Sequence, residues 1–420
     1  MNHRHVRYLL VGGGAASSWA CQAIRALDHE GEMMLVGQEP TGPYVRSQLS
    51  REYLQRGSVG RETLFIQEPA WYAAHQIELH TSQPAARLDT GRQTVALASG
   101  LQVSFDKLLL ATGATPNHLN VPGADLPNVY VLRGIAAAAR LHHALDTAKA
   151  QGQRHPRGRG RACIIGGGLL GLELATTLTQ MELAVDLVEI GPHPWPTFAG
   201  EAIGRIASQS LEQHGVALHI PNQVTRLEGD GRVQRVVLLD QTLACDLVLC
   251  CIGSSPNREL LRSTPISAEK AILVDDHCRT NVADIYAAGD CAAIFDPLFG
   301  KHRLLDHMDN AVVTGTLAGT NMAGGDQAYR QVNWFSSNLF DLCVSVWGEA
   351  RVVERRLLRR AAQGLVEIGV SKDGTIAQVV ALGEPQRDTV YRELVARRLR
   401  IDGNEELLKD PQSRLGDLFA

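Results

Sequence analysis

The sequence predicts an α/β protein with two Rossmann-like dinucleotide-binding domains plus a C-terminal α+β domain. A strand, a glycine-rich turn, a helix and a second strand follow one another from residue 6, and the same order returns from residue 162. This order favours a parallel sheet, and its return after a domain-sized interval indicates a duplicated domain. From about residue 331 alternating strands precede a polar helix, which predicts a separate domain.

Length and charge exclude several classes of protein. At roughly 150 residues per domain, 420 residues allow two or three domains. Lys plus Arg number 41 and Asp plus Glu 45, for a net charge of −4, whereas non-specific nucleic-acid binding needs a broad basic face. No apolar run approaches the roughly 18–20 residues that span a bilayer, and the first residues lack a signal-peptide pattern. We therefore expect a soluble, cytoplasmic protein.

The eight cysteines form no C-x-x-C pair and no zinc-ligand spacing. Several lie in apolar runs, where cysteine acts as a small hydrophobic residue. We expect no metal site and no dithiol redox centre. His307 lies in Asp306-His307-Met308-Asp309, which a hydrogen-bonded structural cluster explains better than a metal site.

The first glycine turn reads Gly12-x-Gly14-x-x-Ser17. In such turns the first glycine permits a tight bend, the second lets a pyrophosphate approach the backbone, and the third position packs the helix against the strand. Ser17 occupies the third position of this turn, where a small side chain is tolerated. Glu39, which follows Gln38, is the nearest acid after the second strand. We expect strands at residues 6–11 and 33–36 and a helix at residues 15–27.

The second glycine turn, Gly166-x-Gly168-x-x-Gly171, is the complete pattern. Dinucleotide phosphates sit at the N-terminus of the following helix, where free N–H groups favour anions. Glu189 ends the next strand, 18 residues after Gly171, where an acid holds the adenosine ribose hydroxyls. Because a 2′-phosphate would clash with this carboxylate, the sequence favours NADH over NADPH. The alternative interpretation of the whole motif is a glycine turn that serves packing alone. We expect strands at residues 162–165 and 185–189 and a helix at residues 169–181.

An acid also follows a late apolar strand at residues 284–288. Asp290 either binds a sugar-chain hydroxyl of a second dinucleotide or caps the following helix, and the two roles are compatible. Residues 151–161 are polar, glycine-rich and basic; we interpret them as an exposed connector, with phosphate binding as the alternative. We further expect hairpin-like strands within residues 93–110, a helix at 135–150, strands at 246–252, 342–347, 364–370 and 376–382, and a helix at 387–400.

These motifs resemble the FAD-dependent pyridine nucleotide-disulfide oxidoreductase superfamily. Residues 43–51, Pro-Tyr-Val-Arg-Ser-Gln-Leu-Ser-Arg, are similar to the P-Y-x-R-P-P-L-S-K segment of oxygenase-coupled ferredoxin and rubredoxin reductases. Apoptosis-inducing factor and monodehydroascorbate reductase are more distant relatives. Further family-like segments, which together cover essentially the whole chain, are residues 111–114, 121–123, 252–257, 285–290 and 408–418.

The resemblance implies FAD in a discontinuous domain of residues 1–115 and 253–330, NADH in residues 116–252, and an interface domain in residues 331–420. FAD is expected at Gly12, Gly14, Arg46, Arg51, Arg133 and Asp290, and NADH at Gly166, Gly168, Gly171, Glu173 and Glu189. Further cofactor-binding candidates are Ser17, Glu39, Pro84, Leu170, Gly253, Gly289 and Met308. The family pairs the basic residue at position 51 with the acid at 173 near the flavin ring, so Arg51 and Glu173 are the catalytic candidates. Arg51 stands where the family has lysine, and Gln38 where relatives often place an acid.

The electron acceptor has three interpretations. The first is a small ferredoxin- or rubredoxin-like protein, with the reductase a monomer or homodimer. Its candidate docking residues are Arg351, Arg355, Arg356, Arg359 and Arg360, and a solvated edge is the alternative interpretation of these arginines. The second is a quinone or organic radical, because Trp-Phe-Ser-Ser-Asn at residues 334–338 replaces the family's W-F-W-S-D and Ser336 would open space by the flavin. The third is a non-enzymatic signalling flavoprotein similar to apoptosis-inducing factor.

Overall fold

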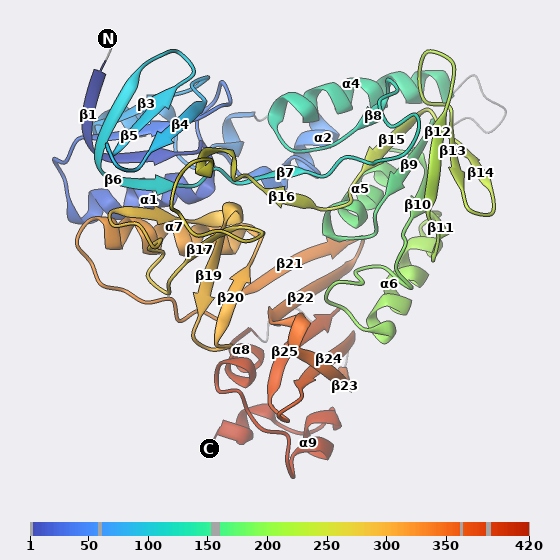
Figure 1. The fold of residues 1–420 in the computed structure, drawn as a ribbon. Helices are drawn as coiled ribbons and strands as arrows, with labels where there is room; N and C mark the ends of the chain where they lie inside the picture. The colour runs from blue at the N-terminus through green and yellow to red at the C-terminus, as the bar shows by residue number, and fades with distance from the viewer. Residues whose placement is uncertain (1–2, 58–60, 153–159, 362–363, 384–387, 420) are drawn as a thin grey trace. The chain divides into compact units, whose positions relative to one another are not determined.

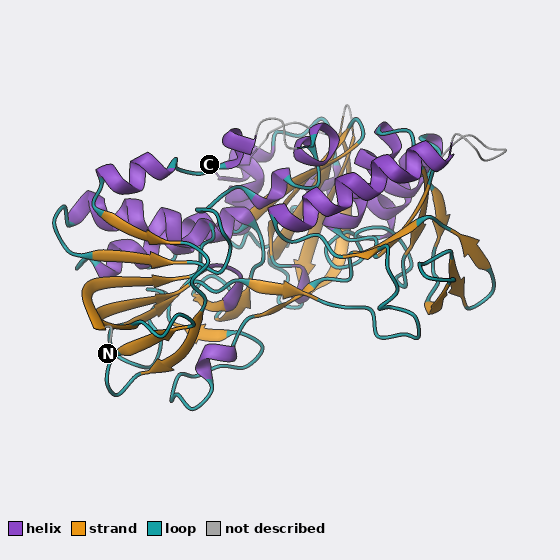
Figure 2. Ribbon diagram, turned by 90° about the horizontal axis from the view of Figure 1, so that it is seen from above, coloured by secondary structure: helices purple, strands orange, loops and turns teal. Residues whose placement is uncertain are grey.

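The computed structural model describes residues 3–57, 61–152, 160–361, 364–383 and 388–419 (Figure 1). The chain divides into two compact units. Unit 1 comprises Met1–Ser47, Gly60–Thr115 and Ser254–Gln331, and unit 2 comprises Gln48–Val59, Pro116–Gly253 and Val332–Ala420. The chain combines helices and strands, as expected of an α/β protein (Figure 2). Among the described residues no helix is long and apolar enough to cross a bilayer. The three-domain division expected from the sequence stays a prediction.

The core of unit 1 is a seven-stranded sheet. Its strands lie in the order β3 (Ile77–His80), β2 (Met33–Val36), β1 (His3–Val11), β6 (Gln102–Leu110), β5 (Thr94–Leu97) and β4 (Ala85–Asp89), and β18 (Ile285–Ala287) pairs with β6. β1, β2, β6 and β18 are parallel, and Val11 stands beside both Val36 and Leu110. These four strands therefore end at one edge of the sheet, where open α/β sheets bind ligands.

Helix α1 (Ala15–Leu27) packs against helix α7 (Met308–Met322) beside this sheet (Figure 1). Glycines allow the close approach. A Cβ on Gly315 would lie 2.3 Å from the carbonyl oxygen of Ala16, and a Cβ on Gly319 would lie 2.5 Å from that of Ala20. The two helices therefore meet backbone to backbone, and α1 is held in place behind the glycine turn that precedes it.

Gly319→Val is expected to lower the free energy of unfolding by about 2–3 kcal/mol, because overpacking forces α7 away from α1 and valine gains little helix propensity over glycine. Thermal unfolding followed by circular dichroism measures the loss. The matched control is Thr316→Ala at a half-buried position of the same helix, with an expected effect of at most about 0.5 kcal/mol. Equal stability of the two variants would contradict the backbone contact.

Smaller elements complete unit 1. A second sheet consists of β17 (Ile272–Val274), β19 (Ala292–Asp296) and β20 (Lys301–Leu304). In its hairpin the Arg303 guanidinium donates to the Asp296 carboxylate at 2.6 Å, and both side chains are buried. Helix α3 (Pro69–Ala74) precedes β3, and β7 (Ala114–Pro116) pairs with β16 (Ser254–Pro256).

Unit 2 contains a second parallel sheet. Its strands lie in the order β11 (Ala217–His219), β10 (Ala184–Val188), β9 (Arg161–Ile165), β15 (Leu247–Cys250) and β8 (Val129–Tyr130). The accompanying elements are α2 (Glu52–Arg56), α4 (Ile135–Gly152), α5 (Leu169–Gln180), α6 (Glu201–Gln213) and the antiparallel strands β12 (Val224–Glu228), β13 (Arg235–Leu238) and β14 (Thr242–Ala244). Ile165 stands beside Val188 and Cys250, so β9, β10 and β15 also end at one edge.

The C-terminal part of unit 2 is an antiparallel sheet. Its strands lie in the order β21 (Trp334–Leu339), β22 (Leu342–Gly348), β25 (Ile376–Leu382), β24 (Gly364–Ser371) and β23 (Val353–Ala361), and helices α8 (Asp388–Ala396) and α9 (Glu405–Lys409) follow. The sequence did not predict β21 and β23. The last predicted helix ends at Ala396 rather than at residue 400, because Arg398 has a φ of 46° and the Leu399 carbonyl accepts from Ile376 of β25.

The predicted basic connector, residues 151–161, is described only at its two ends. α4 continues to Gly152 and β9 begins at Arg161, and residues 153–159 lie outside the described part of the chain. The phosphate-binding alternative for this segment stays a prediction.

Two of the five arginines expected to dock a partner are committed to internal contacts. Arg356 is half-buried and donates to the Phe198 carbonyl and to Gln378. Arg359 is only 3% exposed. Its guanidinium donates to the carbonyl oxygens of Leu407, Leu408, Asp410, Pro411 and Ser413 and to the Ser413 hydroxyl. The expected docking role is therefore corrected for these two residues.

Candidate functional site

The first glycine turn lies at the edge where β1, β2 and β6 end. Gly12 has a φ of +127°, and a Cβ there would meet the Ala111 carbonyl oxygen at 1.9 Å, so only glycine fits. Gly14 has an extended backbone and caps the N-terminus of α1, and no atom of the described residues lies within 4 Å of its Cβ position. No side chain in the described part of the chain caps this helix, so its first N–H groups are available to an anion.

Ser17 occupies the third position of this turn. Its side chain is fully buried, and its hydroxyl has no hydrogen-bond partner among the described residues. The corresponding residue of the second turn, Gly171, is more constrained, because a Cβ there would meet the Gly166 carbonyl oxygen at 1.9 Å. The first turn therefore accommodates a side chain that the second turn excludes. The buried Ser17 side chain therefore serves the packing of α1 against the strand.

Carboxylates flank the same sheet edge. Glu39 follows β2 and accepts hydrogen bonds from the Tyr44 hydroxyl at 2.6 Å and from Arg46 at 2.5 Å. The Arg46 guanidinium also lies over the Tyr44 ring, 4.7 Å from its centroid. Asp290 follows β18, after Gly289, whose φ is +72°. The sequence-predicted residues Gly12, Gly14, Glu39, Arg46 and Asp290 therefore all belong to unit 1 and adjoin its parallel strands.

The second glycine turn has the same geometry in unit 2. Gly166 has a φ of +109°, and a Cβ there would meet the Cys251 carbonyl oxygen at 2.3 Å. Gly168 is the N-cap residue of α5, and among the residues that the structure describes no side chain caps this helix and no atom lies within 4 Å of the Gly168 Cβ position. The Glu189 carboxylate is buried and accepts from the backbone N–H groups of Gly167 at 2.5 Å and Gly191 at 2.6 Å. The acid that follows β10 is thus joined directly to the glycine turn.

A proline-rich loop closes on this turn. Trp195, between Pro194 and Pro196, is fully buried and donates its backbone N–H to the Gly167 carbonyl at 2.8 Å. The Phe198 ring packs edge-to-face on Phe335 of β21, with centroids 5.2 Å apart. The sequence interpretation missed this loop, although Pro194-Trp195-Pro196 marked a rigid segment between two recognised elements.

Glu173 lies one turn into α5 and collects donors from distant parts of unit 2. Arg51 forms an ion pair with it, as the resemblance led us to expect. Two hydroxyls that the sequence interpretation missed, Ser50 and Ser337, donate to the same carboxylate, each at 2.8 Å. One turn along α5, Thr177 donates to the Ser50 carbonyl at 2.7 Å. The carboxylate is thereby held from three directions.

Comparison with known proteins identifies the family. The model of the family described as pyridine nucleotide-disulphide oxidoreductase matches residues 6–315. This chain belongs to that family. The biphenyl dioxygenase system ferredoxin–NAD(+) reductase component of Paraburkholderia xenovorans is 30% identical over 98% of this chain and 97% of its own. Rhodocoxin reductase of Rhodococcus erythropolis is 29% identical over 94% of this chain and 90% of its own.

Solved structures share the fold of this pyridine nucleotide-disulphide oxidoreductase. The ferredoxin reductase for the CYP199A2 system from Rhodopseudomonas palustris matches with a TM-score of 0.90 at 24% identity, covering all of both chains. Fdr9 matches with a TM-score of 0.83 at 25% identity, covering 98% of this chain and 99% of its own. The predicted α/β class with two Rossmann-like domains is therefore confirmed, and the chain is an oxidoreductase by family.

Although the family's description names a disulphide, all eight cysteines of this oxidoreductase are free. Burial raises the pKa of Cys250 to about 11 and that of Cys245 to about 12. Both thiols are therefore protonated near neutral pH, and a protonated thiol is a poor nucleophile.

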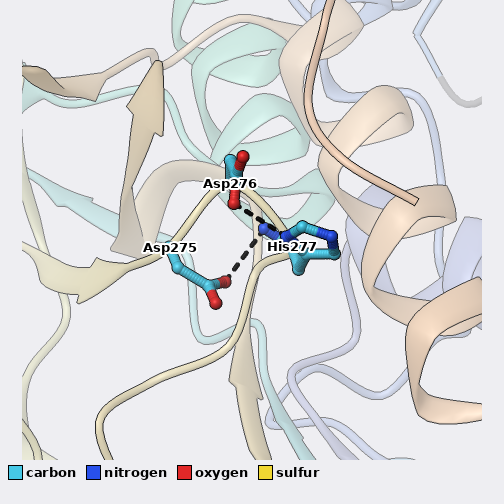
Figure 3. Close-up of side chains that lie close together, drawn as sticks. All are labelled: Asp275, Asp276 and His277. Atoms are coloured by element: carbon cyan, nitrogen blue, oxygen red, sulfur yellow. Dashed lines mark hydrogen bonds and ion pairs between the residues drawn. The ribbon is translucent and has the colours of Figure 1, made fainter. Parts of the chain in front are cut away.

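One cluster among the described residues has the composition of a metal site. Asp275, Asp276 and His277 lie in the turn after β17 (Figure 3). Asp275 accepts from the His277 backbone N–H at 2.9 Å, and Asp276 lies 2.7 Å from Nδ1 of His277. These contacts account for the cluster as a hydrogen-bonded turn. His307 caps α7, and burial lowers its pKa.

The remaining predicted cofactor residues are distributed over both units. Met308 begins α7, and Leu170 lies in the first turn of α5. Gly253 follows β15 with a φ of +85°. Arg133 precedes α4, and the Pro84 carbonyl accepts from Ala98. Their cofactor contacts stay predictions.

Proposed function

We propose that this oxidoreductase uses FAD and NADH and delivers electrons to a small iron–sulfur protein of the ferredoxin or rubredoxin type. The observation that carries the proposal is the pair of glycine turns. Gly14 and Gly168 each open an uncapped helix at the carboxyl edge of a parallel sheet, with free space where a side chain would stand. Two such turns fit two dinucleotides.

The residues of unit 1 fit FAD. Its pyrophosphate would lie at the N-terminus of α1, where Gly14 leaves room and the helix dipole favours an anion. Glu39 and Asp290 are placed to accept hydrogen bonds from sugar-chain hydroxyls, because both follow parallel strands at the same edge.

The residues of unit 2 fit NADH rather than NADPH. The Glu189 carboxylate is fixed by Gly167 and Gly191, so it cannot swing away from an added 2′-phosphate. The loop through Trp195 holds the opposite side of the turn. A fixed carboxylate accepts two ribose hydroxyls and repels a phosphate dianion.

In the proposed mechanism the chain binds and orients, while bound FAD supplies the hydride-accepting and one-electron chemistry. Glu173 fixes the Arg51 guanidinium by an ion pair. Because Glu173 lies one turn into α5, behind the glycine turn proposed for NADH, we assign this pair to the orientation of the nicotinamide. No side-chain nucleophile is required, because the cofactors carry the reactive atoms.

The relatives support the choice of acceptor. The two similar enzymes named above are a ferredoxin reductase component and rhodocoxin reductase, and a rubredoxin-NAD(+) reductase of Pseudomonas putida is 27% identical over 75% of this chain. Ser336, which suggested a small-molecule acceptor, is exposed on β21, whereas its neighbour Ser337 is buried. We therefore propose an iron–sulfur protein ahead of a quinone or a signalling role.

An anaerobic titration of the purified protein tests the proposal. The flavin absorbance is expected to bleach with one equivalent of NADH and far less readily with NADPH, because of Glu189. Addition of an oxidised [2Fe–2S] ferredoxin or a rubredoxin should then restore the colour, with ferricyanide as the control for a competent flavin. If NADH does not bleach the flavin, the proposed NADH oxidoreductase activity is refuted. If the protein reduces a quinone but neither ferredoxin nor rubredoxin, the proposal of an iron–sulfur protein as the electron acceptor is refuted.

A further inference from the structure

Glu173 is the most heavily bonded acid near the second glycine turn. Oε2 accepts from the Ser50 hydroxyl at 2.8 Å, and Oε1 accepts both from the Ser337 hydroxyl at 2.8 Å and from Arg51. The Glu173 side chain is 10% exposed and that of Arg51 is 39% exposed. A buried carboxylate needs such donors, because it has lost its water.

Ser337 reaches this carboxylate from a rigid strand. It lies in the middle of β21, which pairs with β22 in unbroken register from Trp334 opposite Trp347 to Leu339 opposite Leu342. Ser337 is 3% exposed, whereas Ser336 and Asn338 on either side are exposed. The pleat therefore directs Ser337 inward, as expected of alternating strand residues.

The two serines constrain Glu173 in different ways. Ser50 is adjacent to Arg51, and its carbonyl accepts from Thr177, so this part of the chain is tied to α5 at two points. Ser337 comes from a separate sheet and donates to the same oxygen that pairs with Arg51. Without Ser337 the carboxylate could rotate about its last torsion, and Arg51 would follow it.

We propose that Ser337 is a positioning residue for hydride transfer, through which the C-terminal sheet fixes the Glu173–Arg51 pair. This inference rests on the proposed function, because it assigns that pair to the orientation of the nicotinamide of NADH. β21 would thus contribute to the reduction of the flavin by NADH, before any acceptor protein binds. Ser337 acts only through Glu173 and touches no reacting atom.

The test is a double-mutant cycle on the flavin-containing protein. Stopped-flow reduction by NADH is measured for wild type, Ser337→Ala, Glu173→Ala and the double variant. Ser337→Ala is expected to slow hydride transfer about 3- to 10-fold with the NADH dissociation constant changed less than about twofold, because removal of one positioning donor affects the transition state more than binding. In the Glu173→Ala background the same substitution is expected to have no further effect.

Two controls separate positioning from folding. Ser345→Ala removes an equally small buried hydroxyl from the neighbouring strand, where Ser345 stands opposite Ser336, and is expected to leave hydride transfer unchanged. The thermal midpoints of wild type, the two single variants and the double variant provide a readout other than activity. The changes in midpoint caused by the two substitutions should be non-additive if the Ser337–Glu173 hydrogen bond forms in solution.

The outcomes are distinct. A normal rate in Ser337→Ala, or an equal slowing in both backgrounds, overturns the positioning role even if the thermal midpoints are coupled. Additive thermal midpoints overturn the hydrogen bond itself. If NADH does not reduce the flavin of the wild-type protein, both the proposed function and this inference are refuted. If NADH reduces the wild-type flavin normally but the effects of the two substitutions on the rate are additive, the inference alone is refuted.

Discussion

Replacing Gly168 by alanine is expected to give a folded yellow protein that NADH reduces poorly. The Gly168 backbone is extended, with φ −77° and ψ −168°, and nothing lies within 4 Å of the added methyl, so neither strain nor a clash opposes folding. The methyl would occupy the space proposed for the pyrophosphate. Overpacking of about 1–3 kcal/mol corresponds to a rise of roughly 5- to 150-fold in the NADH dissociation constant.

Gly14→Ala is the matched variant at the other turn. Its backbone is equally permissive, with φ −108° and ψ −174°, and its Cβ position is equally open. The same methyl should therefore weaken FAD instead of NADH and yield a protein that is isolated largely without flavin. The flavin content of the purified proteins and the dissociation constant for NADH distinguish the two variants. If Gly168→Ala binds NADH as tightly as wild type, the second turn does not hold a pyrophosphate.

Arg359→Ala is expected to cause the largest loss of stability, about 2–4 kcal/mol, because a buried acceptor left without its donor costs about 1–3 kcal/mol and several are affected. The guanidinium binds the carbonyl oxygens of the segment from Leu407 to Ser413. Removing it should release that segment from β23. Chemical unfolding measures the loss, and limited proteolysis should detect new cleavage after residue 400.

The neighbouring arginine is a close control for this loss. Arg360 lies next to Arg359 on β23, but it is exposed. Arg360→Ala removes the same charge and the same length of side chain, and it is expected to change stability by no more than about 0.5 kcal/mol. Similar effects of the two substitutions would mean that charge, rather than the buried anchor, stabilises this edge.

Sequence reasoning located the elements whose signals are local. Both glycine turns, Glu189 and Asp290 follow short apolar strands, and each strand is buried where the sequence placed it. A glycine that needs a positive φ, such as Gly166, and a strand of β-branched residues both express their preference within a few residues. The family resemblance then correctly anticipated the Arg51–Glu173 ion pair.

The remainder depends on contacts between distant residues. Ser337 is 164 positions from Glu173, and nothing in Ser336-Ser337 distinguishes the inward serine until the register of β21 is known. The buried Arg359 lies in a run of arginines typical of an exposed edge, so its composition suggested a docking surface. A shift of one residue along a strand moves every side chain to the opposite face of the sheet. Composition alone therefore could not predict which serine or arginine is buried.

The order in which the chain supplies the first sheet also affects its synthesis. β6 ends at Leu110, and its parallel neighbour β18 ends at Ala287, with residues 116–253 of the other unit between them. At about 5–20 residues per second a ribosome would need roughly 10–35 s to proceed from Leu110 to Ala287. During this time the buried apolar residues Leu108, Leu109 and Leu110 lack their neighbour. The nascent chain therefore carries an open strand edge that invites mispairing, and Asp290, which follows β18, joins this edge only late in biosynthesis.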